Sequence, residues 1–177
     1  RYGLLSNEKM GELIKKHIGD ELITESKIPI SMVATDAASG EKVVIKDGSI
    51  TDAVKASTCI PGIFNPIKIN NKMMIDGGIV ENVPIDTVRN MGAYYVIGID
   101  LNAQFKYEKP KHIFDVLLNS FHFTLLTSSK LQTKDADLLI KPDLSSFSRS
   151  NTDQVDSLMK QGYDDAKKAL VKFSLAP

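Results

Sequence analysis

The chain alternates between stretches with a two-residue apolar period, typical of strands, and stretches with a helical apolar period. Strands are predicted at residues 28–35, 42–46, 66–69, 72–75, 94–101 and 137–141. Helices are predicted from Ser6 to Gly19, through Ala53 and Ala56, from Pro84 to Gly92, from His112 to Leu131, and from about Val155 onward. Strands that alternate with helices favour an α/β fold, with a layered, mostly parallel sheet and flanking helices.

Two of the predicted strands define the surroundings of one acidic residue. Residues 66–69 and 72–75 flank Asn70 and Asn71, and asparagine tolerates the positive φ of a tight hairpin turn. Asp76 therefore comes at the end of a strand, directly before two glycines. The later segment YYVIGIDL, residues 94–101, is apolar enough to be a central strand that is buried on both faces.

The predicted helix from His112 to Leu131 is unusually apolar. Its large side chains are Ile113, Phe114, Leu117, Leu118, Phe121, Leu125 and Leu126. Such a helix is typical of a protein core, and we expect it to be buried. The alternative is a surface that contacts a membrane peripherally, in which case the helix would lie at the mouth of a site for lipids.

Composition limits the class of protein. The 177 residues, 42% hydrophobic and 25% charged, fit a single domain spanning residues 1–177. Lys plus Arg and Asp plus Glu both number 22, so no net charge attracts nucleic acid. Cys59 is the single cysteine, and no Cys/His cluster has metal-ligand spacing, which favours a cytoplasmic protein without a metal site. Because residue 1 is Arg rather than Met, we expect that further sequence stood upstream.

Asp76 has two interpretations from the residues alone. Asp-Gly between apolar residues is a common hairpin signal, which would make Asp76 a turn residue. Asn82 and Pro84 follow closely, however, and proline cannot donate a hydrogen bond to a return strand. The second interpretation is a strand-end carboxylate that Gly77 and Gly78 leave open to another group or a ligand. The pattern leaves both open.

Other reactive side chains give weaker indications. All three histidines fall within predicted helices, and none is placed as a catalytic base: His17, His112 and His122. The sequence contains no G-x-S-x-G nucleophile elbow and no glycine-rich phosphate loop. Cys59 fits a small packing residue. Asp36 and Asp100 each end a predicted strand, and we expect them to be polar strand ends, with the alternative that they line the same site as Asp76.

Three segments together resemble the bacterial patatin-like phospholipases. They are KASTCIPGIFNPIKINNKMMIDGGIVENVPIDTVRNMGAYYVIGIDL from Lys55, ADLLIKPDLSSFS from Ala136 and GYDDAKKAL from Gly162. Their order and spacing fit, so the resemblance covers nearly the whole chain. It implies a lipid acyl hydrolase, a phospholipase or esterase that cleaves carboxylic esters with a serine–aspartate dyad and no cofactor. In the family's D-G-G/A motif, here Asp76, Gly77 and Gly78, the resemblance makes Asp76 the catalytic base.

The resemblance also implies what lies outside the chain. In the family, the glycine-rich oxyanion loop and the G-x-S-x-G serine precede the segment that GLLSNEKMGELI, residues 3–14, resembles. The chain would then be the C-terminal part of a patatin-like domain, without its nucleophile and first strand. We expect a lipid or ester substrate, an upstream segment or companion chain as partner, and self-association through the incomplete sheet. The alternative is a non-catalytic remnant that binds lipid or protein.

Overall fold

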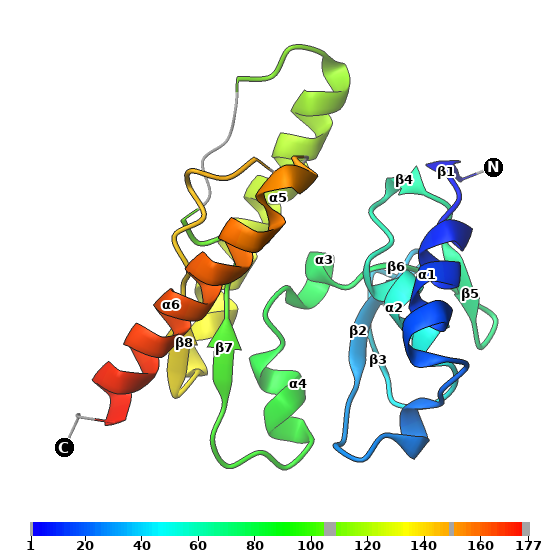
Figure 1. Ribbon diagram of the computed structural model, residues 1–177. Coiled ribbons are helices and arrows are strands. Elements are labelled where there is room, and N and C mark those ends of the chain that lie inside the picture. The colour runs from blue at the N-terminus through cyan, green and yellow to red at the C-terminus, as the bar shows by residue number, and fades with distance from the viewer. Residues whose placement is uncertain (1, 105–108, 149–150, 175–177) are drawn as a thin grey trace. The chain divides into compact units, whose positions relative to one another are not determined.

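The computed structural model describes residues 2–104, 109–148 and 151–174, which divide into two compact units, residues 1–82 and 83–177 (Figure 1). Unit 1 contains β1 (Gly3–Leu5), α1 (Glu8–Ile18), β2 (Met32–Asp36), β3 (Lys42–Ile45), α2 (Ile50–Ser57), β4 (Gly62–Phe64), β5 (Ile67–Ile69), β6 (Lys72–Asp76) and α3 (Gly78–Glu81). Unit 2 contains α4 (Ile85–Asn90), β7 (Ile97–Ile99), α5 (Ile113–Gln132), β8 (Leu138–Ile140) and α6 (Val155–Ser174). Short 3₁₀ turns occupy Ile23–Glu25, Thr133–Asp135 and Thr152–Gln154.

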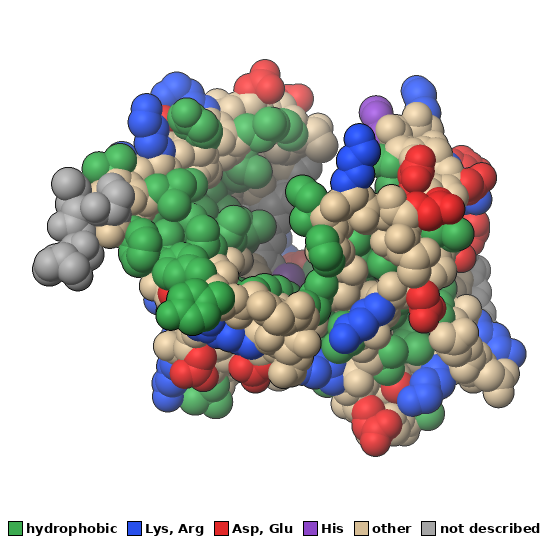
Figure 2. Space-filling view, turned by 90° about the horizontal axis from the view of Figure 1, so that it is seen from below, with side chains coloured by type: hydrophobic (Ala, Val, Ile, Leu, Met, Phe, Trp, Pro, Cys, Tyr) green, Lys and Arg blue, Asp and Glu red, His purple; other side chains and the backbone are tan. Residues whose placement is uncertain are grey.

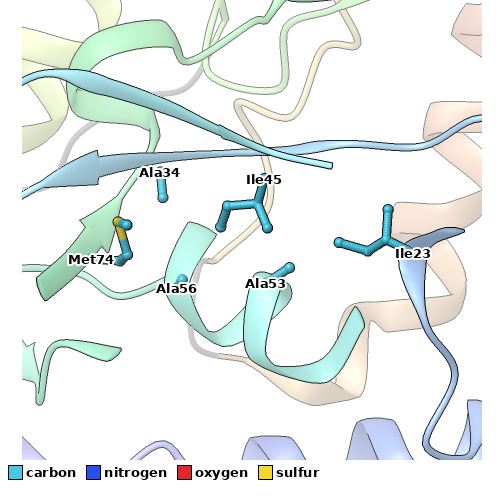
Figure 3. Packing of buried hydrophobic residues seen from close by; sticks show 6 residues of the cluster. All are labelled: Ile23, Ala34, Ile45, Ala53, Ala56 and Met74. Carbon is cyan, nitrogen blue, oxygen red and sulfur yellow. The ribbon is translucent and has the colours of Figure 1, made fainter. Parts of the chain in front are cut away.

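The core of unit 1 lies between α2 and a four-stranded antiparallel sheet with the order β3-β2-β6-β5. Alternate residues of each strand point to the α2 side, because successive side chains of a strand face opposite ways. Figure 3 shows the buried members of this core, which are Ile23, Ala34, Ile45, Ala53, Ala56 and Met74. Ser49 caps α2 by accepting a hydrogen bond from the Asp52 N–H, which fixes where the helix begins.

The β5–β6 hairpin forms as its turn residues predict. Asn70 and Asn71 both have positive φ, 49° and 65°, the conformation of a two-residue turn that matches the twist of the strands. The turn sets the register Ile67↔Met74, which directs both side chains into the core. Asp76 consequently ends β6 opposite Ala34 of β2, on the α2 side of the sheet.

Unit 2 is built around a parallel pair of strands, β7 and β8. One face of this pair packs against a cluster formed by Val83, Ile85 and Val96, and a Cβ on Gly98 would lie 2.9 Å from the Ile85 side chain. On the other face, α6 contacts β8, and the rings of Tyr95 and Phe173 lie 5.2 Å apart. Helix α6 thus packs against β8, whereas the Ile97 and Ile99 side chains of β7 stay partly exposed.

The predicted α/β class with flanking helices is confirmed, and most predicted elements occur within a few residues of their expected positions. The pairing differs from the expectation of a mostly parallel sheet. The two-stranded sheets β1–β4 and β7–β8 are parallel, but the four-stranded sheet is antiparallel throughout. Tight turns join β2 to β3 and β5 to β6, and such turns can connect only antiparallel neighbours. The single-domain interpretation stays a prediction.

The prediction of a long strand over residues 94–101, buried on both faces, is wrong in both length and burial. The observed strand β7 has three residues, and its outward side chains Ile97 and Ile99 are 47% and 54% exposed. In the part of the chain that the structure describes, β7 pairs with β8 alone, so its other edge is open. Figure 2 shows hydrophobic side chains gathered over a wide area of unit 2, on the left of the view.

The helix expected to be buried is also exposed along much of its length. In α5, Leu125 and Ser129 are buried, but Ile113 is 73% and Leu117 61% exposed. The core prediction therefore holds for one side of the helix only. None of the described helices combines the length and the apolar character that crossing a bilayer requires.

Candidate active site

The backbone around Asp76 is fixed by neighbouring elements of unit 1. Its N–H donates to the Cys59 carbonyl at 2.9 Å, just beyond the C-terminal end of α2, and its own carbonyl accepts from the Thr35 hydroxyl at 2.8 Å. The next N–H, of Gly77, donates to the Ser57 carbonyl at 3.3 Å. Asp76 is thus held between β2 and the end of α2, which orients its side chain.

Gly77 is required by a close approach of two backbones. A Cβ at this position would lie 1.9 Å from the carbonyl oxygen of Val33 and 2.4 Å from its carbonyl carbon. Because both atoms belong to the backbone of β2, no rotamer change could relieve the clash. The first glycine therefore brings the chain close to β2, rather than leaving space beside the carboxylate as the sequence suggested.

The Asp76 carboxylate is only partly satisfied. Its Oδ1 accepts a hydrogen bond from the Gly78 N–H at 2.8 Å, whereas Oδ2 accepts none from the described residues. Burial raises the pKa of Asp76 above its ordinary value, and the Gly78 N–H opposes that rise without cancelling it. A desolvated carboxylate with one unused oxygen is suited to accept a proton from a nearby donor.

The hairpin interpretation of Asp76 is wrong. The chain after Asp76 enters the short helix α3, whose first N–H is the one bound to Oδ1, and no return strand follows β6. The turn that carries the hairpin signal is Asn70-Asn71 instead. The second interpretation, a strand-end carboxylate, agrees with the structure, while a catalytic role for Asp76 stays a prediction.

The carboxylates of the other two strand-end aspartates accept hydrogen bonds from nearby backbone N–H groups. Asp36 accepts from the Ala38 N–H at 3.0 Å and pairs with Lys72 at 3.3 Å, and these contacts hold its pKa below the ordinary value. Asp100 is buried at the end of β7 and accepts from the Asn102 N–H at 3.0 Å. Asp100 belongs to unit 2, whereas Asp36 and Asp76 share the sheet of unit 1.

No histidine hydrogen-bonds Asp76 among the described residues. His17 is exposed on α1, and His112 precedes α5, where its Nδ1 lies 3.1 Å from the Asp115 carboxylate. His122 lies within α5, with its ring 5.8 Å from that of Phe121. A Ser-His-Asp arrangement centred on Asp76 is therefore absent from the part of the chain that the structure describes.

Cys59 interacts with Asp76 through its backbone carbonyl and through the effect of the carboxylate charge on its thiol. It is fully buried, and burial, followed by the negative charge of Asp76, raises the pKa of its thiol to about 11. The Sγ atom lies 3.3 Å from the Asn65 carbonyl, to which the protonated thiol donates. Since a thiol attacks only as the thiolate, Cys59 is a packing residue, as the sequence predicted.

Sequence reasoning missed the residues that hold Asp76 in place. Thr35 and Ser57 contribute to the site through a hydroxyl and a carbonyl group, and no periodic pattern marks either of them. The strands β1 and β4 were also missed, since three-residue strands give too short a pattern.

No group of three or more potential metal ligands occurs among the described residues.

Comparison with known proteins identifies the family. Residues 2–89 match the family model described as patatin-like phospholipase. An uncharacterized NTE family protein of Mycobacterium bovis is 31% identical over 101 residues, covering 57% of this chain and 28% of the relative. A second uncharacterized NTE family protein of Mycobacterium bovis is 24% identical over 187 residues, which cover 92% of this chain and 32% of the relative. Patatin-like phospholipase domain-containing protein 6 of Mus musculus is 36% identical over 87 residues, which cover 48% of this chain and 6% of the relative.

Residues 2–89 belong to the patatin-like phospholipase family, and the relatives support the same assignment. The aligned part of the chain spans about a third or less of the length of these curated relatives.

Proposed function

We propose that this chain forms part of a lipid acyl hydrolase in which Asp76 is the general base of a serine–aspartate dyad. The observation that carries the proposal is the Asp76 carboxylate itself, which is desolvated, held by the Gly78 N–H through Oδ1, and unbound among the described residues at Oδ2. The match to the patatin-like phospholipase family supports carboxylic esters of lipids as the proposed substrate class. The location of such an enzyme in the cytoplasm is part of the same proposal.

The proposed reaction uses Asp76 twice. The serine oxygen attacks the ester carbonyl carbon and forms a tetrahedral intermediate, while the proton of the serine hydroxyl passes to Oδ2 of Asp76. Collapse of this intermediate releases the alcohol, which takes the proton, and leaves an acyl-serine. Water then attacks the acyl-serine while Asp76 accepts a proton from it, and collapse of the second tetrahedral intermediate breaks the bond to serine, releases the free acid and returns the proton from Asp76 to the serine oxygen. A carboxylate whose pKa is raised by burial is a better base for these steps than an ordinary one.

The serine is proposed to come from a segment outside these 177 residues. The sequence contains no G-x-S-x-G motif, and no described hydroxyl or thiol hydrogen-bonds the Asp76 carboxylate. The relatives are about three times as long as the part that aligns, or longer, which leaves ample room for such a segment. Either the same polypeptide or a companion chain would supply it.

The outward face of β7 is where that additional segment would also pack. Ile97 and Ile99 are half exposed there, and a two-stranded sheet alone is only marginally stable in water. A further strand and its covering helix would bury both side chains and pair the open edge. The 177 residues in isolation are therefore expected to self-associate, which static light scattering would detect. A sharply melting monomer would contradict this part of the proposal.

The decisive test is Asp76→Asn in the full-length protein, with ester hydrolysis measured beside circular dichroism. The amide oxygen can still accept from the Gly78 N–H, so the fold should persist, but an amide cannot take the serine proton. We expect a loss of turnover of ~10²–10⁴-fold, the usual contribution of a general base. Asp36→Asn is the matched control, because Asp36 lies in the same sheet with its carboxylate bound by Ala38 and Lys72. Full activity of Asp76→Asn would refute the proposal.

A non-catalytic module that binds lipid or protein is the alternative that the same protein can test. A fluorophosphonate probe should label one serine of the full-length protein and none within residues 1–177. If the full-length protein took up no probe and hydrolysed no ester, while still binding lipid vesicles, the binding function would be favoured over the hydrolase.

A further inference from the structure

Helix α5 is apolar on two sides, yet only one side packs against the rest of unit 2. Leu125 and Ser129 are buried at 6% and 0% exposure, and they define the packed side. The opposite side carries exposed apolar residues at helical spacing, namely Ile113, Val116, Leu117, Phe123 and Leu131. A helix that faces water normally carries charges on its outer side, so this helix requires a second apolar environment.

The polar side chains of the exposed side support this conclusion. Ser120, Thr124 and Thr127 each donate a hydroxyl hydrogen bond to the carbonyl four residues earlier, at 2.7, 3.1 and 3.0 Å. Hydroxyls bonded in this way need no partner outside the helix. From Val116 to Ser129 the sequence has no Asp, Glu, Lys or Arg. The exposed side therefore offers few polar groups for a directional contact with another molecule.

Charged residues gather at the two ends of α5 instead. The described residues 109–135 contain four lysines, Lys109, Lys111, Lys130 and Lys134, all of them exposed. The acidic residues in the same range are Asp115 and Asp135. Asp115 is already engaged, since it accepts from the Lys111 N–H at 2.9 Å and lies 3.1 Å from His112 Nδ1. The ends of the helix consequently carry a positive excess around an uncharged middle.

We propose that the exposed side of α5 lies in the surface of a lipid bilayer that contains anionic lipids. An apolar face enters the boundary between headgroups and acyl chains, and lysines at its ends reach the negative headgroups. The helix is not long and apolar enough to cross a bilayer, which fits a helix lying in the plane of the surface. A protein partner fits less well, because protein interfaces are depleted in lysine and carry regular hydrogen bonds.

The proposal goes beyond the hydrolase function and stands on α5 alone. Asp76 belongs to unit 1, and α5 belongs to unit 2, so variants of one can be compared with variants of the other. The Asp76→Asn protein should bind vesicles as the unchanged protein does, whatever its activity. Failure of the lipid proposal and failure of the dyad proposal are therefore distinguishable.

The test is co-sedimentation of the full-length protein with vesicles of phosphatidylcholine alone or mixed with phosphatidylglycerol. We expect binding to the mixed vesicles, and a loss of about ten-fold or more in the double variant Ile113→Asn with Leu117→Asn, since both side chains would leave the apolar layer. Leu13→Asn is the matched control, because Leu13 is 57% exposed on α1 of unit 1. Its binding should not change.

A second variant separates the charge from the apolar face. Lys111→Gln with Lys130→Gln should reduce the preference for anionic vesicles, and added salt should remove what remains of it. Equal binding of the Asn variant and the unchanged protein would overturn the proposal. So would an absence of vesicle binding, or a dimer that dissociates in the Asn variant, which would assign this side of α5 to a second copy of the chain.

Discussion

Two strand ends in the sheet of unit 1 carry aspartates on the same side, and the protein uses them differently. Asp36 ends β2, and its carboxylate is engaged by the Ala38 N–H and by Lys72, which lower its pKa. Asp76 ends the neighbouring strand β6 and has a raised pKa and one Oδ oxygen unbound among the described residues. The difference means that neighbouring groups compensate the charge of Asp36, whereas the charge of Asp76 is compensated less.

The backbones after the two aspartates differ as well. Asp36 is followed by Ala37, which carries a Cβ and whose N–H donates to the Met73 carbonyl at 2.8 Å. Asp76 is followed by Gly77, where a Cβ would meet the backbone of β2. The strand end at Asp76 is thus the more constrained of the two in its backbone and the less satisfied in its side chain.

The largest expected effect on stability comes from Gly77→Ala. The added Cβ would lie 1.9 Å from the Val33 oxygen, so either β2 or the Asp76 segment must move. We expect a loss of more than about 3 kcal/mol, or a failure to fold, because backbone atoms cannot move aside cheaply. Thermal unfolding followed by circular dichroism measures the effect.

Gly162→Ala is the control for the same change. Gly162 lies within α6, and nothing lies within 4 Å of the position that its Cβ would take. Alanine favours a helix over glycine by about 0.5–1 kcal/mol, so this variant should melt at a higher temperature than the unchanged protein. A melting temperature of Gly77→Ala equal to that of the unchanged protein would disprove the close approach at β2.

The second expected effect compares Asp76→Asn with Asp36→Asn at neutral pH. A raised pKa in the folded state means that ionised Asp76 opposes folding, so Asp76→Asn should raise the melting temperature by a few degrees. A lowered pKa means that ionised Asp36 favours folding, so Asp36→Asn should reduce the melting temperature. The two variants remove the same charge and should shift stability in opposite directions.

The pH dependence of these shifts follows from the same signs. The cost of Asp76 arises as the pH rises from its unfolded-state pKa to its higher folded-state pKa, and stays constant above that range. The benefit of Asp36 is lost as the pH falls through its lower folded-state pKa. As the pH is lowered from neutral, the melting temperature of each variant should therefore approach that of the unchanged protein. A shift of the same sign in both variants would break the comparison.

Local chemistry made much of unit 1 predictable from the sequence. The positive φ of Asn70 and Asn71 fixed the hairpin, and that hairpin correctly placed Asp76 at a strand end. The expected burial of β7 and α5 failed for a different reason, since an apolar pattern reports a need for an apolar environment and not what supplies it. Ile97 and Leu117 are equally apolar in the sequence, and no pattern shows that both are exposed in this chain.

At the site itself, sequence could identify Asp76 but not its state. The raised pKa depends on burial, which arises from contacts between segments that are distant in sequence. Val33 and Cys59, which lie 43 and 17 residues before Asp76, provide the close backbone and the hydrogen bond that hold it. These contacts require the register of β2 against β6, which the sequence did not predict.

The smallest expected effect uses Cys59 as a reporter of the Asp76 charge. Burial is the main cause of the raised thiol pKa of about 11, and the Asp76 carboxylate is the second. Asp76→Asn should therefore increase the thiolate fraction, and with it the alkylation rate at mildly alkaline pH, by less than about ten-fold, since the larger cause remains. Asp36→Asn should leave the pKa of the thiol unchanged, because Asp36 does not contribute to it. The rate assigned to Cys59 is obtained by subtracting that of Cys59→Ser. Equal acceleration in both aspartate variants would mean that the fold had loosened, whereas acceleration in Asp76→Asn alone would place an ionised carboxylate beside the thiol.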